Sequence, residues 1–311
     1  MARPIRIEYP GAFYHITARG NERKEIFKGT QDRQKFLFYL ESATSRYQAV
    51  IHVYCLMNNH YHLLLQTPAG NLSQILQHIN GAYTIYFNTR RRRWGHLFQG
   101  RYKAILVDAD AFAAELSRYI HLNPVRAGLT IRPEEYPWSS YQYYIGRREK
   151  PSWLTVDLIL GYFHGKPSRS KKEYREFVHA LVDQEYESPL RDTMASTILG
   201  STDFVYTIKE RYLTGRKPDR NVPALTELSK LSIPEILNAA KDEWGEDNPL
   251  TKKAAIYLCR EYSGRTLKEI GNHFGIGESA VSQASRRFQW TLNEDPKLRT
   301  NIQDLRRKLK L

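Results

Sequence analysis

Two histidines stand one residue apart in the stretch LMNNHYHLLLQT, from Leu56 to Thr67. The apolar run around them predicts a β-strand. Side chains alternate between the two faces of a strand, so His60 and His62 face the same side. Two imidazoles on one face can bind one divalent metal ion. The alternative, which this spacing leaves open, is a structural pair that is hydrogen-bonded inside a core.

A tyrosine and an asparagine form a second pair in the stretch SRYIHLNPVRAGL, from Ser117 to Leu129. Tyr119 and Asn123 are four residues apart, which places them on one face of a helix. The amide oxygen of Asn123 can complete a metal shell, and the phenol of Tyr119 can attack a phosphate that this metal polarises. The alternative is a tyrosine that packs in the core.

A basic segment, NTRRRRWGHLFQGRYK, runs from Asn88 to Lys103 and contains six Lys or Arg residues and no acidic residue. Trp94, Phe98 and Tyr102 are interleaved with these charges. Arginines that bind phosphates and rings that stack on bases are typical of nucleic-acid binding, whereas a solvated charged loop is the alternative. The expected DNA contacts in this segment are Arg90, Arg91, Arg92, Arg93, Arg101 and Lys103.

The elements that must position these residues follow from periodicity in the first 145 residues. Strands are predicted for residues 12–19, 49–57, 61–67 and 102–108, and helices for residues 32–48, 72–90 and 109–123. Asn58 and Asn59 are turn residues, so the second and third strands should form a hairpin, and Pro124 should end the last helix. The order β-α-β-β-α-β-α predicts a ferredoxin-like split βαβ domain with one extra helix.

The rest of the chain is predicted to be helical. Residues 146–223 are interpreted as a helical connecting segment and linker, because TGRKPDRNVP at residues 214–223 combines glycine, prolines and charges. Residues 224–311 are interpreted as a second, all-α domain. Two of its predicted helices are separated by Gly275 and Gly277, which is the layout of a helix-turn-helix. The expected fold class is therefore α+β, with a catalytic domain at residues 1–145.

The composition indicates the kind of partner and the compartment. The chain has 47 basic and 33 acidic side chains, a formal charge of +14, which favours nucleic acid or another anionic partner. Its two cysteines are far apart and exclude a disulfide framework and a Cys-based zinc cluster. We find no signal-peptide pattern and no apolar run of membrane-spanning length. We therefore expect a soluble, cytoplasmic protein without a membrane partner.

Four blocks of the sequence together resemble the REP-associated tyrosine transposases, a branch of the HUH single-strand nucleases. These blocks are YHITARGNERKEIF, NNHYHLLLQT, GHLFQGRYKAILVD and RYIHLNPVRAGL, and the resemblance covers about residues 3–141. It implies that His60, His62 and Asn123 bind a divalent ion, Mg²⁺ or Mn²⁺, and that Tyr119 is the nucleophile. It also implies that the substrate is single-stranded, hairpin-forming DNA, cleaved and rejoined through a 5′-phosphotyrosine.

The same resemblance suggests further DNA contacts. The segment around Gly20 would help to read a short single-stranded guide tetranucleotide beside the hairpin, and we carry this over to Arg19 and Asn21. Arg126, in the last block, is a further expected DNA contact. Five further histidines are expected to be structural or exposed, namely His15, His52, His78, His96 and His121.

Residues 232–309 resemble the C-terminal duplex-binding domain of the bacterial replication initiator DnaA. Where the recognition helix of the initiator opens with Asp-His-Thr, this chain has Glu278, Ser279 and Ala280, so the sequence preference of the initiator is not carried over. The expected contacts with duplex DNA are Ser282, Gln283, Arg286 and Arg287. A helical bundle for protein contacts is the alternative.

The leading hypothesis is therefore a metal-dependent single-tyrosine transposase. One alternative is a DNA-binding regulator that keeps the transposase fold without cutting DNA. Another is a metal-dependent nuclease that uses water, in which Tyr119 has no chemical role. The sequence also leaves open the DNA target, the preferred metal and the choice between monomer and dimer.

Overall fold

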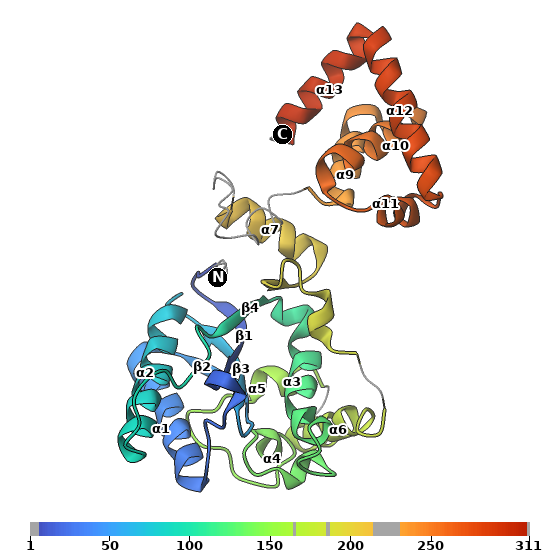
Figure 1. Cartoon of the computed structure of the whole chain (residues 1–311). Helices are drawn as coiled ribbons and strands as arrows, with labels where there is room; N and C mark the ends of the chain where they lie inside the picture. The colour runs from blue at the N-terminus through green and yellow to red at the C-terminus, as the bar shows by residue number, and fades with distance from the viewer. Residues whose placement is uncertain (1–5, 164–165, 185–186, 214–230, 310–311) are drawn as a thin grey trace. The chain divides into compact units, whose positions relative to one another are not determined.

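A computed structural model describes residues 6–163, 166–184, 187–213 and 231–309 of the chain (Figure 1). The chain divides into two compact units, Met1–Arg216 and Lys217–Leu311, and each is described by itself. The expected linker at residues 214–223 lies outside the described residues.

The first unit is built on a five-stranded sheet with the strand order β2-β3-β1-β4-β5. Its strands are β1 (Ala12–Arg19), β2 (Val50–Leu56), β3 (His60–Thr67), β4 (Lys103–Val107) and β5 (Ile198–Leu199). Neighbours among the first four strands are antiparallel, whereas β5 pairs in parallel with β4. The sheet is therefore mixed, and β5 is an edge strand that the sequence patterns did not predict.

Helices cover both faces of this sheet. α1 (Thr30–Tyr47) and α2 (Leu72–Arg90) pack on one face, and α3 (Ala109–Arg126) packs on the other (Figure 1). The alternation along β3 explains this arrangement, because the ring of Tyr61 contacts Phe36 of α1 while the ring of His62 approaches Tyr119 of α3. The predicted order β-α-β-β-α-β-α is confirmed, and the unit belongs to the α+β class.

The predicted end of α3 at Pro124 is wrong. The helix continues to Arg126, with Pro124 inside its last turn. Proline removes one backbone donor, but the turn is closed by the amides of Ala127 and Leu129, which donate to Asn123 and Pro124 at 2.9 Å. The helix end therefore lies one turn beyond Asn123, and Arg126 belongs to the same helix as Tyr119.

Six further helical elements of the first unit follow α3 in the described residues. They are η2 (Pro133–Glu135), α4 (Tyr141–Tyr144), α5 (Asp157–Leu160), α6 (Pro167–His179), η3 (Pro189–Asp192) and α7 (Thr202–Tyr212). Residues up to 213 thus lie in the same compact unit as β1–β4. The boundary at residue 145 between a catalytic domain and a connecting segment stays a prediction.

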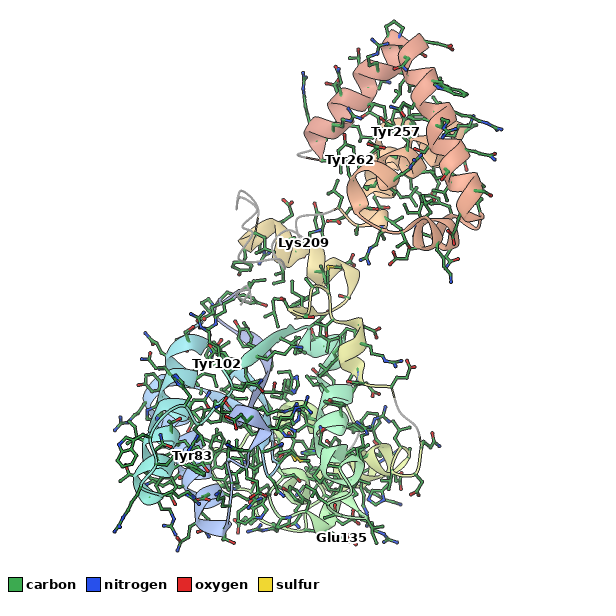
Figure 2. The ribbon with its side chains drawn as sticks, viewed as in Figure 1. Tyr83, Tyr102, Glu135, Lys209, Tyr257 and Tyr262 are labelled. Carbon is green, nitrogen blue, oxygen red and sulfur yellow. The ribbon has the colours of Figure 1, made fainter. Side chains whose placement is uncertain are left out.

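The second unit consists of helices around its own apolar core. They are α9 (Ile233–Trp244), α10 (Pro249–Leu258), a π-helical turn η4 (Cys259–Ser263), α11 (Leu267–Phe274), α12 (Glu278–Glu294) and α13 (Pro296–Lys308). Arg306 of α13 donates to the hydroxyl of Tyr257 at 3.1 Å and lies over the ring of Tyr262, both labelled in Figure 2.

Two glycines explain the tight connection between α11 and α12. Gly275 ends α11 with a φ of +68°, a left-handed conformation that glycine adopts without strain. A Cβ at Gly271 would lie 2.5 Å from the carbonyl oxygen of Ile276, so the turn can fold back onto α11 only over a glycine. Two helices joined by a short turn, as predicted around Gly275 and Gly277, are therefore present.

Candidate active site

The two histidines of the HxH pair lie at the start of β3, on the face of the sheet that α3 covers. In the strand register, His60 is opposite Arg19, and His62 lies between Thr17 of β1 and Cys55 of β2. The ring centroids of His60 and His62 are 5.0 Å apart. The two imidazoles therefore lie close together on the same face of the sheet, as the strand alternation predicts.

The hairpin turn before β3 orients His60. Nδ1 of His60 lies 2.6 Å from Oδ1 of Asn59, and the amide nitrogen of Asn59 donates to the carbonyl of Arg23 at 3.0 Å. Because this second bond fixes which end of the Asn59 amide is the oxygen, Nδ1 of His60 must be the donor. Nε2 of His60 then carries a free electron pair. Sequence reasoning missed Asn59, whose signal is its position directly before the first histidine.

His62 lies deeper in the site, with 5% of its surface exposed. Its Nδ1 is 3.0 Å from Nε2 of His15, whereas its Nε2 is buried and has no hydrogen-bond partner among the described residues. A buried polar atom without a partner is costly unless a ligand satisfies it. The position of this nitrogen therefore fits a metal ligand.

Burial keeps these imidazoles neutral. It lowers the pKa of His60 to about 4 and that of His15 to about 3, with smaller contributions from the nearby charges of Arg19 and Lys103 respectively. Burial also holds the pKa of His62 well below its usual range, and the neighbouring His15 and His60 add to this. Neutral imidazoles have the free electron pair that a metal ligand requires.

α3 brings Tyr119 to the histidines. The ring of Tyr119 meets those of His62 and His15 edge-on, at centroid distances of 6.1 and 6.3 Å. Asn123 follows one turn later, and its amide nitrogen donates to the carbonyl of Tyr119 at 2.8 Å. This bond leaves the Oδ1 of Asn123 as the atom with ligand character.

Two cations approach the same neighbourhood. The guanidinium carbon of Arg126 lies over the ring of Tyr119, 5.4 Å from its centroid. Lys103, the first residue of β4, is opposite Thr17 in the sheet, and Thr17 is in turn opposite His62. Lys103 is exposed, so its ammonium can reach a bound phosphate beside the histidines.

The end of the basic segment pairs with the end of β1. The amide of Asn21 donates to the carbonyl of Leu97, and the amide of Gln99 donates to the carbonyl of Arg19, both at 2.8 Å. A Cβ at Gly20 would lie 2.0 Å from the carbonyl oxygen of Lys24, so this crossing requires glycine. Because Arg19 is opposite His60, the basic segment is brought to the HxH end of the sheet.

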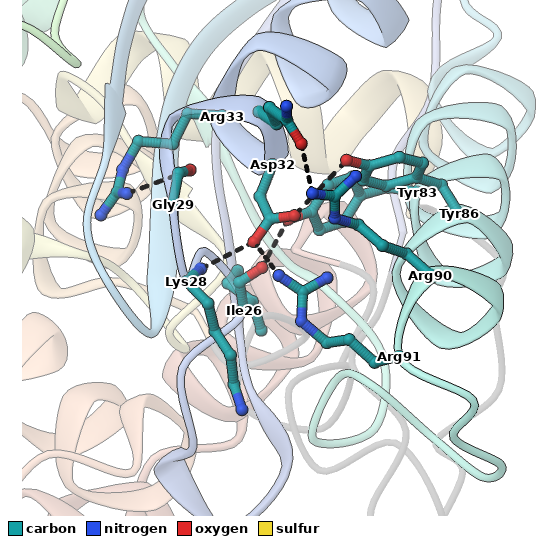
Figure 3. Close-up of polar contacts among 10 residues, drawn as sticks. Ile26, Lys28, Gly29, Asp32, Arg33, Tyr83, Tyr86, Arg90 and Arg91 are labelled. Carbon is teal, nitrogen blue, oxygen red and sulfur yellow. Dashed lines mark hydrogen bonds and ion pairs between the residues drawn. The ribbon is translucent and has the colours of Figure 1, made fainter.

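The arginines of the basic segment differ in their contacts within the protein and in their exposure. Arg91 forms an ion pair with Asp32, whose carboxylate is 1% exposed and also accepts from the backbone amide of Lys28 at 2.8 Å (Figure 3). Arg90 donates to Gln31, and Arg93 donates to the carbonyl of His96 at 2.9 Å. Arg92 and Arg101 are exposed. The position of Arg91 therefore favours a structural role.

The three aromatic residues of the segment differ in the same way. Trp94 is 88% exposed. Phe98 packs edge-on against Tyr61 at a centroid distance of 6.2 Å, and Tyr102, labelled in Figure 2, lies under the guanidinium of Arg6. Of these rings, Trp94 is the one whose face is available for stacking on a base.

A pocket of about 210 Å³ adjoins the crossing of β1 and the basic segment. Asn21 lines it together with Lys24, Lys28, Arg91 and Arg93. Glu25 also lines this pocket, so one carboxylate stands among four cations and the amide of Asn21, and the excess of positive charge suits a phosphate.

In the second unit, the expected duplex contacts lie on α12. Gln283, Arg286 and Arg287 are exposed, whereas Ser282 is partly buried. Trp290 is 60% exposed and follows Arg286 and Arg287 by one helical turn, so it shares their face. Sequence reasoning did not include Trp290, although its spacing from the two arginines was the available signal.

Two features are absent from the described residues. These residues contain no group of three or more His, Cys, Asp or Glu side chains arranged to hold a metal ion, so a metal at the histidine pair needs a ligand of another type. The amide oxygen of Asn123 is an atom of such a type. Within these same ranges, no helix is both long enough and apolar enough to cross a membrane.

Comparison with known proteins shows a likeness to one protein family over part of the chain. Residues 9–123 match the family model described as "Transposase IS200 like", and this range contains β1 to β4, both histidines, Tyr119 and Asn123. The chain is therefore similar to this transposase family over residues 9–123. A solved "REP associates tyrosine transposase bound to a REP hairpin" is 17% identical, with a TM-score of 0.42, over 51% of this chain and 93% of that one.

One curated relative matches over a short range. The chain is 36% identical over 61 residues to the chromosomal replication initiator protein DnaA of Nautilia profundicola. The match covers 19% of this chain, and the chain spans 14% of the length of that relative.

Proposed function

We propose that the first unit is a metal-dependent, single-tyrosine transposase. It cleaves and rejoins single-stranded, hairpin-forming DNA on a ferredoxin-like split βαβ scaffold, and Tyr119 is its nucleophile. The observation that carries this proposal is the edge-on approach of the Tyr119 ring to the His62 ring, at a centroid distance of 6.1 Å. Both residues lie in the segment, residues 9–123, that matches the transposase family model. His60, His62 and Asn123 would supply the ligand atoms.

The residues fit a divalent cation, Mg²⁺ or Mn²⁺. Nε2 of His60 has a free electron pair, and the buried Nε2 of His62 has no partner among the described residues. These two nitrogens and the Oδ1 of Asn123 would hold the ion. When bound, it would polarise the scissile phosphate and offset the negative charge of its oxygens.

The chain's own residues then account for the reaction. The Tyr119 hydroxyl releases its proton to solvent and its oxygen attacks phosphorus, the bond from phosphorus to the 3′ oxygen breaks, and the 3′ oxygen takes a proton from solvent to become a 3′-OH. The guanidinium of Arg126 lies over the Tyr119 ring and places a positive charge beside the proposed nucleophile. The 5′-phosphotyrosine keeps the energy of the broken bond, so a 3′-OH can reverse the step and join strands.

The charged and aromatic residues around the site would hold the DNA strand. Arg19, Asn21, Arg92, Arg101, Lys103 and Arg126 are the proposed contacts, with Arg19 and Asn21 reading a guide sequence. Trp94 would stack on a base, since its ring is exposed beside Arg92. Arg90, Arg91 and Arg93 already have partners in the protein, which makes their contribution to DNA binding smaller.

The second unit is proposed to bind duplex DNA through a helix-turn-helix formed by α11 and α12. Gln283, Arg286 and Arg287 are exposed on α12, and Ser282 is proposed as a further contact. The partial likeness to DnaA supports this proposal.

The experiment that tests the catalytic proposal is capture of the covalent intermediate. End-labelled hairpin DNA is incubated with the full chain and Mn²⁺, and the mixture is separated by denaturing electrophoresis. We expect a protein–DNA adduct with the wild type and none with Tyr119→Phe. Tyr206→Phe is a matched control, because Tyr206 is a half-exposed tyrosine on α7 outside the site, and it should form the adduct.

Each rival function has its own outcome in this assay. Cleavage by the wild type without an adduct would favour a nuclease that uses water. DNA binding without cleavage or adduct would favour a regulator.

A further inference from the structure

His15 faces His62 across two neighbouring strands. Its side chain on β1 is 2% exposed, and β1 pairs with β3 so that Thr17 is opposite His62, which places His15 one pleat further along the same face. The two rings are nearly parallel, with 8° between their planes. Nε2 of His15 is 3.0 Å from Nδ1 of His62. The two buried imidazoles therefore share one hydrogen bond.

This bond allows two arrangements of protons. A neutral imidazole has one N–H and one free electron pair, so one ring must donate and the other must accept. If His15 donates, the proton of His62 is on Nε2, and that nitrogen cannot bind a cation. If His62 donates, its Nε2 has a free electron pair.

The surroundings of the pair distinguish these arrangements when a cation is bound. Nε2 of His62 and Nδ1 of His15 are both buried and have no hydrogen-bond partner among the described residues. A cation at Nε2 of His62 satisfies that nitrogen only if Nδ1 of His62 donates to His15. His60 has the corresponding arrangement, since its Nδ1 donates to Asn59.

We propose that His15 is a positioning residue: it accepts the Nδ1–H of His62 and thereby presents Nε2 of His62 to a divalent cation. The inference rests on the metal site of the proposed function. It assigns to His15 a part in the site, where the sequence alone indicated a structural or exposed histidine. Partners of this kind fix the proton and the ring orientation of histidine ligands.

Two variants of nearly equal size test the acceptor. Methionine and glutamine have the same side-chain length, but the amide oxygen of glutamine accepts a hydrogen bond where the thioether is a weak acceptor. We expect His15→Met in the full chain to weaken Mn²⁺ binding, measured by calorimetric titration, by about 10- to 100-fold. His15→Gln should restore binding close to that of the wild type. Wild-type affinity in His15→Met would overturn the proposal.

A control separates this role from packing. His52 is also 2% exposed and lies on the same sheet, near the start of β2, where its ring stacks on Phe13. His52→Met should therefore leave Mn²⁺ affinity unchanged. Equal losses of affinity in His52→Met and His15→Met would show that disturbed packing is the cause and would overturn the proposal.

A measurement on the wild type does not depend on whether any variant folds. Long-range ¹H–¹⁵N NMR with bound Zn²⁺, a diamagnetic ion that imidazole nitrogens bind, locates the proton of His62. We expect that proton on Nδ1, and a proton on Nε2 would overturn the proposal.

His60→Ala separates this inference from the proposed function. Loss of Mn²⁺ binding in His60→Ala but not in His15→Met would overturn only the role of His15. Unchanged Mn²⁺ affinity in His60→Ala would overturn the metal site itself, and the role of His15 with it.

Discussion

The three proposed metal ligands differ in their expected affinity for a cation and in the hydrogen bonds that orient them. His60 and His62 are neutral imidazoles that each have one nitrogen engaged by the protein, by Asn59 and His15 respectively. Asn123 offers a neutral amide oxygen, a weaker ligand than imidazole, and its own nitrogen is bonded to the backbone of α3. The three residues should therefore contribute unequally to metal binding.

We predict that His60→Ala and His62→Ala each abolish measurable Mn²⁺ binding and DNA cleavage together, because each removes one of three protein ligands. Asn123→Ala should weaken both less, since water can replace an amide oxygen. Calorimetric titration with Mn²⁺ and the adduct assay measure the two effects. His78→Ala is the control, because His78 is on α2 and hydrogen-bonds to Ser42. Unchanged Mn²⁺ affinity in both histidine variants would contradict the prediction.

Replacing two adjacent arginines should affect different properties, DNA binding for Arg92 and stability for Arg91. Arg92 is exposed, so Arg92→Ala should weaken single-stranded DNA binding and reduce the salt slope by about 0.7 per lost phosphate contact, without changing the melting temperature. Arg91→Ala should instead destabilise the fold by about 3 kcal/mol, because it leaves the buried Asp32 carboxylate without its ion-pair partner. Filter binding across a salt series and thermal unfolding measure these effects. Unchanged stability in Arg91→Ala would argue against a structural role.

At the scale of the elements, α3 is held by polar contacts as well as by packing. His121 is buried, and its ring nitrogens lie 2.7 Å from the Tyr174 hydroxyl of α6 and 2.8 Å from the Ser140 hydroxyl. Ser140 also bonds the backbone of Tyr54 in β2. α3, which contains the proposed nucleophile, is thus connected by hydrogen bonds to α6 on one side and, through Ser140, to the sheet on the other.

A second polar cluster reinforces the same region. The carboxylate of Glu134 is 2% exposed and lies 3.0 Å from His179, 3.5 Å from Arg147 and 3.7 Å from Arg175. Burial opposes its ionisation, but a backbone hydrogen bond and the positive charges of His179 and Arg147 outweigh this. The pKa of Glu134 is therefore held below its ordinary value of 4.5.

This cluster gives a pH-dependent prediction. A carboxylate whose pKa is lower in the folded state stabilises the fold above its unfolded pKa, and the contribution is lost as the pH falls through the folded pKa. Glu134→Gln should lower the stability by on the order of 2 kcal/mol at pH 7. The difference from the wild type should shrink as the pH falls below 4.5, the ordinary value for a glutamate.

Denaturant unfolding at several pH values measures this dependence. The control is Glu176→Gln, whose exposed pair with Lys172 should contribute less than about 1 kcal/mol. A stability difference that stays constant down to pH 3 would contradict the role of the Glu134 carboxylate.

The sequence could predict features that depend on local spacing. The shared face of His60 and His62 follows from strand alternation, and the face shared by Tyr119 and Asn123 follows from helical periodicity. The contact between His15 and His62, 47 residues apart, depends on strand register, which no local pattern specifies. β5 has two residues, too few to show a strand pattern in the sequence, and it is recognised as a strand by its pairing with β4. The roles proposed for these site residues remain predictions.

At the scale of the whole molecule, the two units have separate cores. The apolar cluster of the second unit contains Ile236, Leu258, Ile270 and Leu305, all in the range after residue 230. All the residues of the proposed catalytic site are in the first unit. The proposed activities should therefore be separable.

We predict that a truncation after Arg216 still forms the covalent adduct with a short hairpin. Its affinity for duplex DNA should fall, with a shallower salt slope, because fewer phosphates are neutralised. Arg286→Ala and Arg287→Ala in the full chain should reproduce part of that loss without affecting cleavage. Filter binding on duplex DNA and sedimentation of both forms measure the effects. Unaltered duplex affinity, especially with a changed oligomeric state, would favour a protein-binding bundle instead.

The ion pair between Asp32 and Arg91 also has an evolutionary consequence. A guanidinium can hold the buried carboxylate while it lies against the ring of Phe87, 4.0 Å from the ring centroid, and an ammonium does not reproduce that planar contact. Arg92, one residue later, faces solvent and is free to exchange with lysine as sequences diverge. Within the run of four arginines, we therefore expect Arg91 to change only together with residue 32, whereas Arg92 should vary between arginine and lysine, which both bind phosphate.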